Sequence, residues 1–339
     1  MIEDVLSGTA SVRTARRGHL GCIILDKPKR LNAVDLDMAT GIERALAAWR
    51  NDPSVQSVLI ESSAPRAFCA GGDLKAIRDV LLAEGPDVAF DLMSRVYQTM
   101  LHIAQYAKPV VSFMDGIAMG GGVGLGGHAR YRVVTENSIV AMPETSIGLV
   151  PDAGGSWLLA QAPGGAGLRL ALTGGRMSGV EAVAMGFADY MVPADSLEDL
   201  RGLLALRPVE DVFGLIAPLP LPERACALVE YDPSASLEQI VRGLERSEQT
   251  VAKADLLDIS RACPTSIFAA WYGWQLARRA ASLEEAFAIE GRLVRYMLQR
   301  PDFAEGVRAR LIDRDNAPLW QPPILAAVDV AALEAILAA

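Results

Sequence analysis

The sequence has few of the residues from which metal sites and disulfide frameworks are built. Its three histidines, His19, His102 and His128, lie far apart, and no two of its four cysteines form a Cys-x-x-Cys pair. The usual spacing of a zinc site is therefore absent, and we expect no bound metal. The cysteines are Cys22, Cys69, Cys226 and Cys263. Because they are scattered along a long chain with no recognisable signal peptide, we expect reduced thiols in a cytoplasmic protein.

The chain also lacks an excess of basic residues and any long apolar run. Its 32 lysines and arginines are outnumbered by 41 aspartates and glutamates, which gives a net charge of -9. General nucleic-acid binding needs a basic face and is not expected, although a local basic patch could still hold an anionic small ligand. No uncharged apolar run approaches the ~18 residues of a membrane span, so we expect no membrane partner.

Strand-like and helix-like segments alternate through the first 195 residues. The loops that follow the strands hold the unusual residues, an order typical of α/β architecture with a site at the strand ends. From residue 196 onward the pattern is mostly helical, and Pro218-Leu-Pro-Leu-Pro222 is the clearest linker. We therefore expect a core over residues 1–195 and a helical region over 196–339. The expected strands cover residues 18–26, 55–61, 108–113, 131–134 and 138–141. One expected helix follows residues 31–35 and runs to about residue 50, and another covers 87–106.

Two carboxylates stand in the otherwise apolar or small stretch Met142-Pro-Glu-Thr-Ser-Ile-Gly-Leu-Val-Pro-Asp-Ala-Gly-Gly155. Glu144 and Asp152 each follow a proline, which fixes the backbone and favours an ordered, irregular loop. Apolar neighbours make partial desolvation plausible, and desolvation raises a carboxyl pKa toward the range useful for a base or nucleophile. The alternative is that both acids are helix caps, with Asp152 preceding a helix that starts near Gly154.

Two short glycine loops, Ala70-Gly71-Gly72 and Gly120-Gly121-Gly122, each follow an expected strand. Glycine lets a backbone N–H approach a ligand without obstruction, so one N–H from each loop could form an oxyanion hole. The alternative is that the glycines only permit tight strand–helix packing. The dinucleotide-type match Gly122-Val-Gly124-Leu-Gly-Gly127 is rejected, because no helix of sufficient length separates it from the next strand.

These segments together resemble the enoyl-CoA hydratase/isomerase (crotonase) superfamily over roughly residues 18–192. Within it, Met142-Pro-Glu-Thr with Pro151-Asp-Ala-Gly-Gly155 is most similar to the 3-hydroxyisobutyryl-CoA hydrolase branch, as is the C-terminal run Asp302-Phe-Ala-Glu-Gly-Val-Arg308. The other segments that carry the resemblance are Lys29-Arg-Leu-Asn-Ala33, Ala67-Phe-Cys-Ala-Gly-Gly-Asp73, Lys108-Pro109, and Gly116 with Gly120-Gly-Gly122.

The resemblance implies a ββα spiral core, followed by the mostly helical C-terminal region, that binds an acyl-CoA. The thioester carbonyl would accept from the N–H groups of Gly72 and Gly121, with Glu144 and Asp152 as the catalytic pair. Coenzyme A would arrive as part of the substrate, so no separate cofactor is expected. Relatives commonly form trimers or paired trimers; a homo-oligomer is one expected state, and an extension that covers its own protomer is the other. The implied substrate and CoA contacts are Lys29, Arg30, Ala70, Gly71, Asp73 and Gly120, with Lys27 nearby.

Hydratases of the superfamily use two glutamates, and by the matching motifs the first would fall at Gly124 and the second at Glu144. Glycine cannot act as a base, so hydration by that route is disfavoured. We expect hydrolysis of 3-hydroxyisobutyryl-CoA or a similar short 3-hydroxyacyl-CoA, as part of valine breakdown, with Glu144 as nucleophile or general base. The alternative is an enoyl-CoA hydratase/isomerase.

The chain departs from the hydrolase branch in the helix before the third expected strand. That branch usually carries Glu-Glu-Tyr there, whereas Arg95 and Val96 precede Tyr97 in this chain. The departure concerns the acyl specificity more than the reaction type, and it also leaves open a non-catalytic acyl-CoA-binding protein. The spacing of Met93, Val96 and Met100 predicts the buried face of an amphipathic helix.

Overall fold

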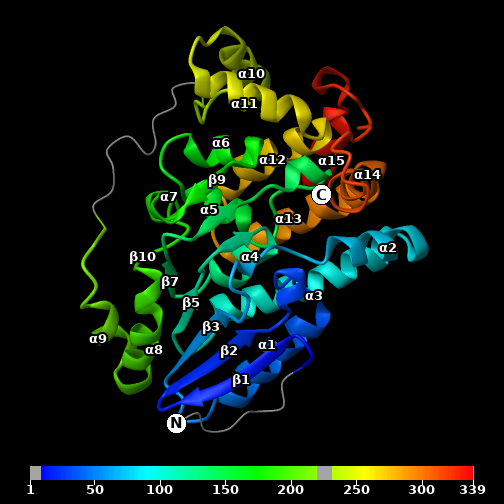
Figure 1. Cartoon of the computed structure of the whole chain (residues 1–339). Helices are drawn as coiled ribbons and strands as arrows, with labels where there is room; N and C mark the ends of the chain where they lie inside the picture. Colours follow the sequence, from blue (N-terminus) through cyan, green and yellow to red (C-terminus); the bar gives the residue numbers. More distant parts are fainter. Residues whose placement is uncertain (1–8, 220–230, 339) are drawn as a thin grey trace. The chain divides into compact units, whose positions relative to one another are not determined.

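The structure, a computed structural model, describes residues 9–219 and 231–338 (Figure 1). The described chain forms two compact units, one from residues 9–73, 95–140 and 177–219, the other from 74–94, 141–176 and 231–338. The units interleave along the chain, and the division expected at residue 195 stays a prediction. Cys226 and residues 220–222 of the predicted linker lie outside the described residues.

A six-stranded sheet is the centre of the first unit. Its order is β1-β2-β3-β5-β7-β10, in which β1 and β2 are antiparallel and every later pair is parallel. Strands β2 and β3 are buried along nearly their whole length. Continuous apolar runs of this kind are typical of strands that are covered on both faces. The strands are β1 (Val12–Arg17), β2 (Leu20–Leu25), β3 (Ser57–Ser62), β5 (Val110–Phe113), β7 (Tyr131–Val134) and β10 (Tyr190–Met191).

A second sheet of four short strands has the order β4-β6-β8-β9. The chain alternates between the sheets, because β3, β5 and β7 are each followed directly by β4, β6 and β8. Helices follow the first two of these strand pairs, so the expected α/β class and ββα path are confirmed. The strands are β4 (Ala67–Cys69), β6 (Ile117–Met119), β8 (Ile139–Ala141) and β9 (Arg176–Ser178), and the helices that follow β4 and β6 are α2 (Leu74–Glu84), α3 (Pro86–Ala104) and α4 (Gly121–Gly126).

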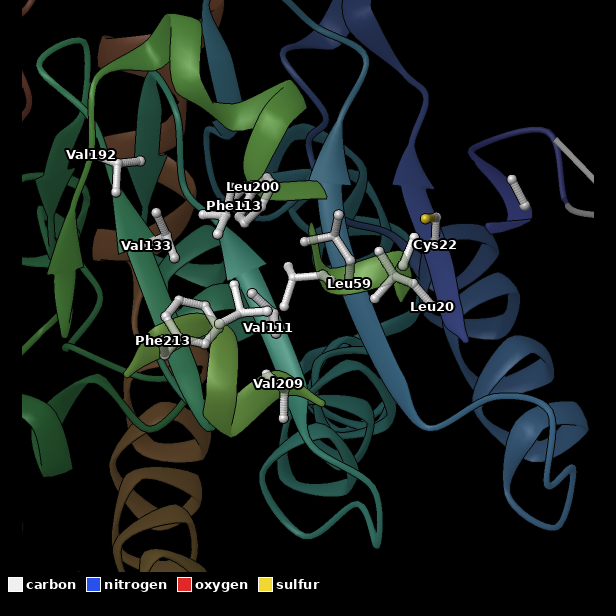
Figure 2. Packing of buried hydrophobic residues seen from close by; sticks show 14 residues of the cluster. Leu20, Cys22, Leu59, Val111, Phe113, Val133, Val192, Leu200, Val209 and Phe213 are labelled. Carbon is white, nitrogen blue, oxygen red and sulfur yellow. The ribbon is translucent and has the colours of Figure 1, made fainter. Parts of the chain in front are cut away.

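The core of the first unit lies between the large sheet and two helices, α8 (Leu197–Leu206) and α9 (Val209–Phe213). Figure 2 shows Leu59, Val111 and Val133 of successive strands packed with side chains from both helices. The ring of Phe213 stacks on Tyr131 with 4.5 Å between centroids. Each fully buried side chain of this size contributes about 1.5–3 kcal/mol of hydrophobic stabilisation, so these contacts fix the sheet on which the site loops are mounted.

Other helices of the first unit are α1 (Leu36–Trp49) and α7 (Gly179–Ala184), with 3-10 turns η1 (Pro28–Arg30) and η3 (Ala194–Ser196). The side chain of Asp35 caps α1 by accepting from the N–H of Met38 at 3.0 Å. Strand β1 and the three-residue strands β4 and β6 were not foreseen. The last two lie inside segments whose small residues predicted loops, and three residues are too few to show a strand period.

The second unit is mostly helical, as expected for the C-terminal region. Helix α12 (Pro264–Ala277) is buried along most of its length and packs with α5, α6 and α13. No helix among residues 9–219 and 231–338 is long and apolar enough to cross a membrane. The remaining elements here are α5 (Gly155–Gln161), α6 (Ala166–Thr173), α10 (Leu237–Arg246), α11 (Thr250–Arg261), α13 (Leu283–Leu298), α14 (Pro301–Val307), the π-helical turn η4 (Arg308–Ile312), α15 (Val330–Ala338) and the 3-10 turns η2 (Glu144–Ile147) and η5 (Leu325–Ala327).

Three cysteines, Cys22, Cys69 and Cys263, are free and buried, which confirms the prediction of reduced thiols for these three. Burial raises the pKa of Cys22 and of Cys69 to about 12 and that of Cys263 to about 11. Thiols held protonated in this way are poor nucleophiles, so we assign them packing roles.

Candidate functional site

The two glycine loops meet within the first unit. The segment around Gly72 pairs with Val34, whose N–H donates to Gly71 and whose carbonyl accepts from Asp73, at 2.8 and 2.9 Å. A Cβ placed on Gly121 would lie 3.4 Å from the Gly72 nitrogen. Among the loop and turn bonds of the described residues, the N–H of neither glycine donates to a backbone carbonyl. The structure therefore places the two glycine loops next to each other, and the oxyanion hole formed by their N–H groups stays a prediction.

The surroundings of this N–H pair are apolar. The Cβ position of Gly121 is 3.1 Å from Val34 and 3.5 Å from the end of Met100, and both side chains are buried. Val96 on the same helix as Met100 is buried too, so the amphipathic face expected for that helix is confirmed. Hydrogen bonds to an acceptor are stronger in such low-dielectric surroundings than in water.

The neighbouring glycine, Gly122, serves packing. Its Cβ position is only 2.0 Å from the Cys69 carbonyl oxygen, so α4 contacts β4 too closely for any side chain there. Gly120, the N-cap of α4, has a positive φ of 49°, which L-residues rarely adopt. The two interpretations of the glycine run thus apply to different residues. Gly121 lies beside the N–H of Gly72, as the oxyanion-hole interpretation requires, and Gly122 permits close packing.

The basic turn at the predicted CoA edge is tied to the first glycine loop. Asp73 accepts from Arg30 at 2.6 Å and from Lys27 at 3.4 Å, and Lys27 also pairs with Asp35. Lys27 is therefore engaged in holding the turn. Lys29 and Arg30 are exposed on η1, where they remain predicted contacts of an anionic ligand. The carbonyl of Leu31 accepts from the Ala70 N–H at 3.0 Å, so the turn and the loop form one network.

Asn32 is a positioning residue that the sequence interpretation missed. Its side chain is fully buried and accepts from the Lys27 N–H at 2.8 Å while donating to Ser62 and to the Phe68 carbonyl at 2.7 and 2.9 Å. It holds a positive φ of 54°. A polar residue between Leu31 and Ala33, next to a proline-containing turn, was the available signal.

In the second unit Glu144 is the first residue of η2 and is only 5% exposed. Its Oε2 atom is buried and has no hydrogen-bond partner among the described residues. Burial, with the charges of Asp152 and then Glu290, raises the pKa of Glu144 well above its usual value of 4.5. The desolvation predicted from its apolar neighbours is confirmed.

The interpretation of the two acids as helix N-caps is wrong. The N-cap of α5 is Gly154, with φ at 75°, and the cap of η2 is Pro143. Asp152 contributes its backbone carbonyl, which accepts from Gly155 at 2.7 Å, and the residue is 6% exposed. Both residues are buried, and the charge of Asp152 contributes to the raised pKa of Glu144.

A third buried carboxylate, Glu290 of α13, completes this cluster and was not foreseen. It is 1% exposed and accepts from the Gly154 and Ser156 N–H groups at 2.7 and 2.9 Å, and from the Ser156 hydroxyl. Burial raises its pKa to about 8. The sequence carried a signal, because Glu290 stands four residues after Ala286 and three before Leu293 on an apolar helix face.

Two other sequence positions bear on the chemistry. Gly124 lies buried in α4, so no carboxylate stands at the position matching the hydratases' first glutamate. Arg95, one of the two residues that replace the branch's usual glutamates, is exposed. Among residues 9–219 and 231–338, no group of three or more His, Cys, Asp or Glu side chains is placed to hold a metal ion.

The sequence matches the enoyl-CoA hydratase/isomerase family over residues 20–337. It is 37% identical over 330 residues to the mitochondrial 3-hydroxyisobutyryl-CoA hydrolase of Rattus norvegicus, covering 93% of this chain and 85% of that protein. The enzyme of the same name from Homo sapiens is 34% identical over 323 residues, with 91% and 83% covered.

Two solved structures resemble the whole fold. The chain shares 36% identity and a TM-score of 0.91 with a carnitinyl-CoA dehydratase from Mycobacterium thermoresistibile, with 97% of both chains covered. With an enoyl-CoA hydratase from Rhodobacter sphaeroides 2.4.1 it shares 36% identity and a TM-score of 0.88, again over 97% of both chains. The similar proteins thus agree in fold and in acting on CoA derivatives, and their names divide between hydrolysis and hydration or dehydration.

Proposed function

Because this chain belongs to the enoyl-CoA hydratase/isomerase family, we propose that it is a CoA thioester hydrolase. Its substrate is 3-hydroxyisobutyryl-CoA or a similar short 3-hydroxyacyl-CoA, and its products are the free acid and CoA. The observation that carries the choice of hydrolysis over hydration is the buried carboxylate pair, Glu144 with Asp152, in a chain that has Gly124 where hydratases place their first glutamate.

In the proposed reaction the N–H groups of Gly72 and Gly121 donate to the thioester carbonyl oxygen. Attack on the carbonyl carbon moves negative charge onto that oxygen, and fixed N–H donors stabilise the charge without reorganisation. Removing one such donor typically raises the activation free energy by about 3–4 kcal/mol. The apolar contacts of Val34 and Met100 beside Gly121 strengthen this effect by excluding water.

Glu144 supplies the reacting oxygen in one of two ways. As nucleophile, its carboxylate attacks the thioester carbon, the C–S bond breaks and CoA leaves as a thiolate that is protonated; water then hydrolyses the mixed anhydride and regenerates Glu144. As general base, it removes a proton from the water that attacks the same carbon; the C–S bond then breaks, and the proton passes to the departing CoA thiolate, which regenerates the carboxylate. Both routes need the ionised carboxylate, so activity follows the deprotonation of a group whose pKa burial raises.

Asp152 has a supporting role in this proposal. Its buried carboxylate orients Glu144 or the substrate's 3-hydroxyl group, or helps to activate the hydrolytic water. A site that hydrogen-bonds a substrate hydroxyl rejects analogues without it, by factors of about 10⁴ in well-built cases. Acyl-CoAs that lack the 3-hydroxyl group are therefore expected to be poor substrates.

The proposal is tested by following two signals on matched substrates. Incubation with 3-hydroxyisobutyryl-CoA is expected to release free thiol in proportion to the protein added. Incubation with the corresponding enoyl-CoA tests the alternative, because a hydratase or isomerase changes the enoyl absorbance without releasing thiol. Loss of enoyl absorbance with no thiol from either substrate would replace hydrolysis by the alternative, and CoA binding without either signal would favour a non-catalytic protein.

Four further expectations remain predictions. A cytoplasmic location rests on the cysteine pattern, and a place in valine breakdown rests on the proposed substrate. A homo-oligomer is expected by analogy with the family, and sedimentation of the purified chain measures it. No cofactor beyond the CoA of the substrate is expected to be needed.

A further inference from the structure

Glu290 is a deeply buried carboxylate of α13, and its hydrogen-bond donors among the described residues belong to the segment that follows Asp152. One oxygen accepts from the Gly154 N–H at 2.7 Å; the other accepts from the Ser156 N–H at 2.9 Å and from the Ser156 hydroxyl. Three donors converge on a side chain that is 1% exposed. A buried carboxylate with this many donors imposes a fixed geometry on its partners.

The segment it holds has an unfavourable backbone. Ala153 and Gly154 are consecutive residues with positive φ, 56° and 75°. A residue with a Cβ pays about 1–2 kcal/mol for the left-handed conformation, so Ala153 needs surrounding contacts to stay in it. The first residue that donates to Glu290 is Gly154, which directly follows Ala153. The bonds to Glu290 therefore brace the turn on which Asp152 is mounted.

We propose that Glu290 is a positioning residue of the reaction: through the Gly154 and Ser156 donors, it fixes the turn that aims the carboxylate of Asp152 and it sets the charge around Glu144. This inference rests on the proposed function. It adds a third carboxylate, contributed by α13 of the helical C-terminal region, to the two carboxylates of the stretch 142–155. In this proposal Glu290 acts through the backbone and through its charge.

Within this cluster of three carboxylates, the negative charges raise the pKa values of their neighbours. The Asp152 charge raises the pKa of Glu290, and the charges of Asp152 and Glu290 both raise the pKa of Glu144. Adjacent buried carboxylates cannot all ionise at little cost, so the protonation of one shifts the others. In the pH range where Glu290 is ionised, removing its charge is therefore expected to lower the pKa of Glu144.

Several titratable groups on α13 and on the elements packed against it have partners outside this cluster, and the buried Nε of Arg292 on α13 has no hydrogen-bond partner among the described residues. Tyr272 of α12 donates to Glu334 of α15 at 2.6 Å. On α14, Asp302 pairs with Arg300 at 3.3 Å and Glu305 with Arg308 at 2.8 Å. Helix α5 has no Asp, Glu, Lys or Arg. On α13 itself, Arg295 pairs with Asp87 at 2.6 Å.

The test compares Glu290→Gln with Glu285→Gln in the full chain. Glutamine has nearly the same shape as glutamate but carries no charge. Its NH₂ group cannot accept a hydrogen bond, so at least one of the donors that converge on Glu290 loses its acceptor. We expect kcat for thiol release to fall by up to about 100-fold while KM is unchanged, since small misplacement of a catalytic group costs about that much. We also expect the acid limb of the pH–rate profile to move to lower pH. Glu285 is exposed on the same helix and accepts only from the Ala281 N–H, so its variant should match the unsubstituted protein.

A second variant covers the case in which Glu290→Gln does not fold. Ser156→Ala removes one donor and leaves both backbone bonds; the hydroxyl bond lowers the pKa of Glu290, so its loss leaves Glu290 less charged. The acid limb is then expected to move in the same direction by a smaller amount, with a smaller fall in kcat. The profile of each variant is measured beside its circular dichroism spectrum and melting temperature.

The outcomes separate cleanly. Unchanged kcat and pH profile in folded Glu290→Gln and Ser156→Ala overturn the inference, and so does a loss of stability with an unmoved acid limb, which describes a purely structural residue. An unsubstituted protein that releases no thiol from any 3-hydroxyacyl-CoA overturns the proposed function first. A moved acid limb with retained KM supports the inference.

Discussion

Substitution of Gly121 by alanine removes one proposed oxyanion donor from use while leaving the fold nearly untouched. The added methyl would sit 3.4 Å from the Gly72 nitrogen, whereas a carbonyl oxygen accepting from that N–H needs to approach to about 2.9 Å. The methyl therefore crowds the space in which the acceptor must lie. Loss of one such donor costs roughly 10²–10³ in kcat, or about 2.7–4 kcal/mol.

The stability cost is expected to be small. The nearest atoms are the Val34 methyl at 3.1 Å and the flexible end of Met100 at 3.5 Å, so a shift of a few tenths of an ångström relieves the contact. Gly121 has no positive φ, and alanine restricts the unfolded chain, which returns about 0.4–1 kcal/mol. Activity and stability should thus separate in this variant.

The matched control is Gly122→Ala, one residue further along α4. Its methyl would lie 2.0 Å from the Cys69 carbonyl oxygen, a backbone atom that cannot move alone. We expect this variant to lose stability, by about 1–3 kcal/mol or more, as overpacked sites do. Thiol release and urea unfolding are measured for both variants. Full activity in Gly121→Ala, or equal loss of stability in both, would refute the reasoning.

Three further predictions concern charge. Because burial raises the folded-state pKa of Glu144, this group stabilises the protein below its ordinary pKa of 4.5 and loses that contribution as pH rises through the raised value. The urea midpoint of Glu144→Gln should therefore exceed that of the unsubstituted protein at mildly alkaline pH and match it in acid. The reverse order of the two midpoints would contradict the burial of Glu144. The acid limb of kcat/KM should lie above pH 4.5 and be absent from any residual activity of the variant. Arg30→Ala should raise KM for the acyl-CoA without lowering kcat, an effect that salt weakens because the side chain is 61% exposed; a salt-independent fall in kcat would argue against a contact with the CoA.

The sequence indicates the spiral core because its strands are apolar runs and its turns carry glycine and proline. The short strands β4 and β6 escape prediction, since their three residues sit among glycines and gain their order only from pairing with each other. A local sequence pattern does not predict which distant segments pair as strands.

The candidate site divides in the same way. The closeness of the loops that hold Gly72 and Gly121 and the desolvation of Glu144 follow from local features, and the structure shows both. Glu290 could not be connected to the stretch before it, because it lies 136 residues from Gly154 and its role depends on how α13 packs. The cap interpretation of Asp152 failed for the same reason: the donors at the start of α5 are satisfied by Glu290 from outside the segment.

The most direct test of the central claim is a thiol-release screen over short acyl-CoAs, with Glu144→Gln and Asp152→Asn measured alongside the unsubstituted protein. We expect thiol release to be fastest for 3-hydroxyisobutyryl-CoA or a close 3-hydroxyacyl-CoA, to be nearly abolished in Glu144→Gln and to be reduced in Asp152→Asn. Thiol release that persists in folded Glu144→Gln, or its absence from every 3-hydroxyacyl-CoA with the unsubstituted protein, would contradict the proposed hydrolase.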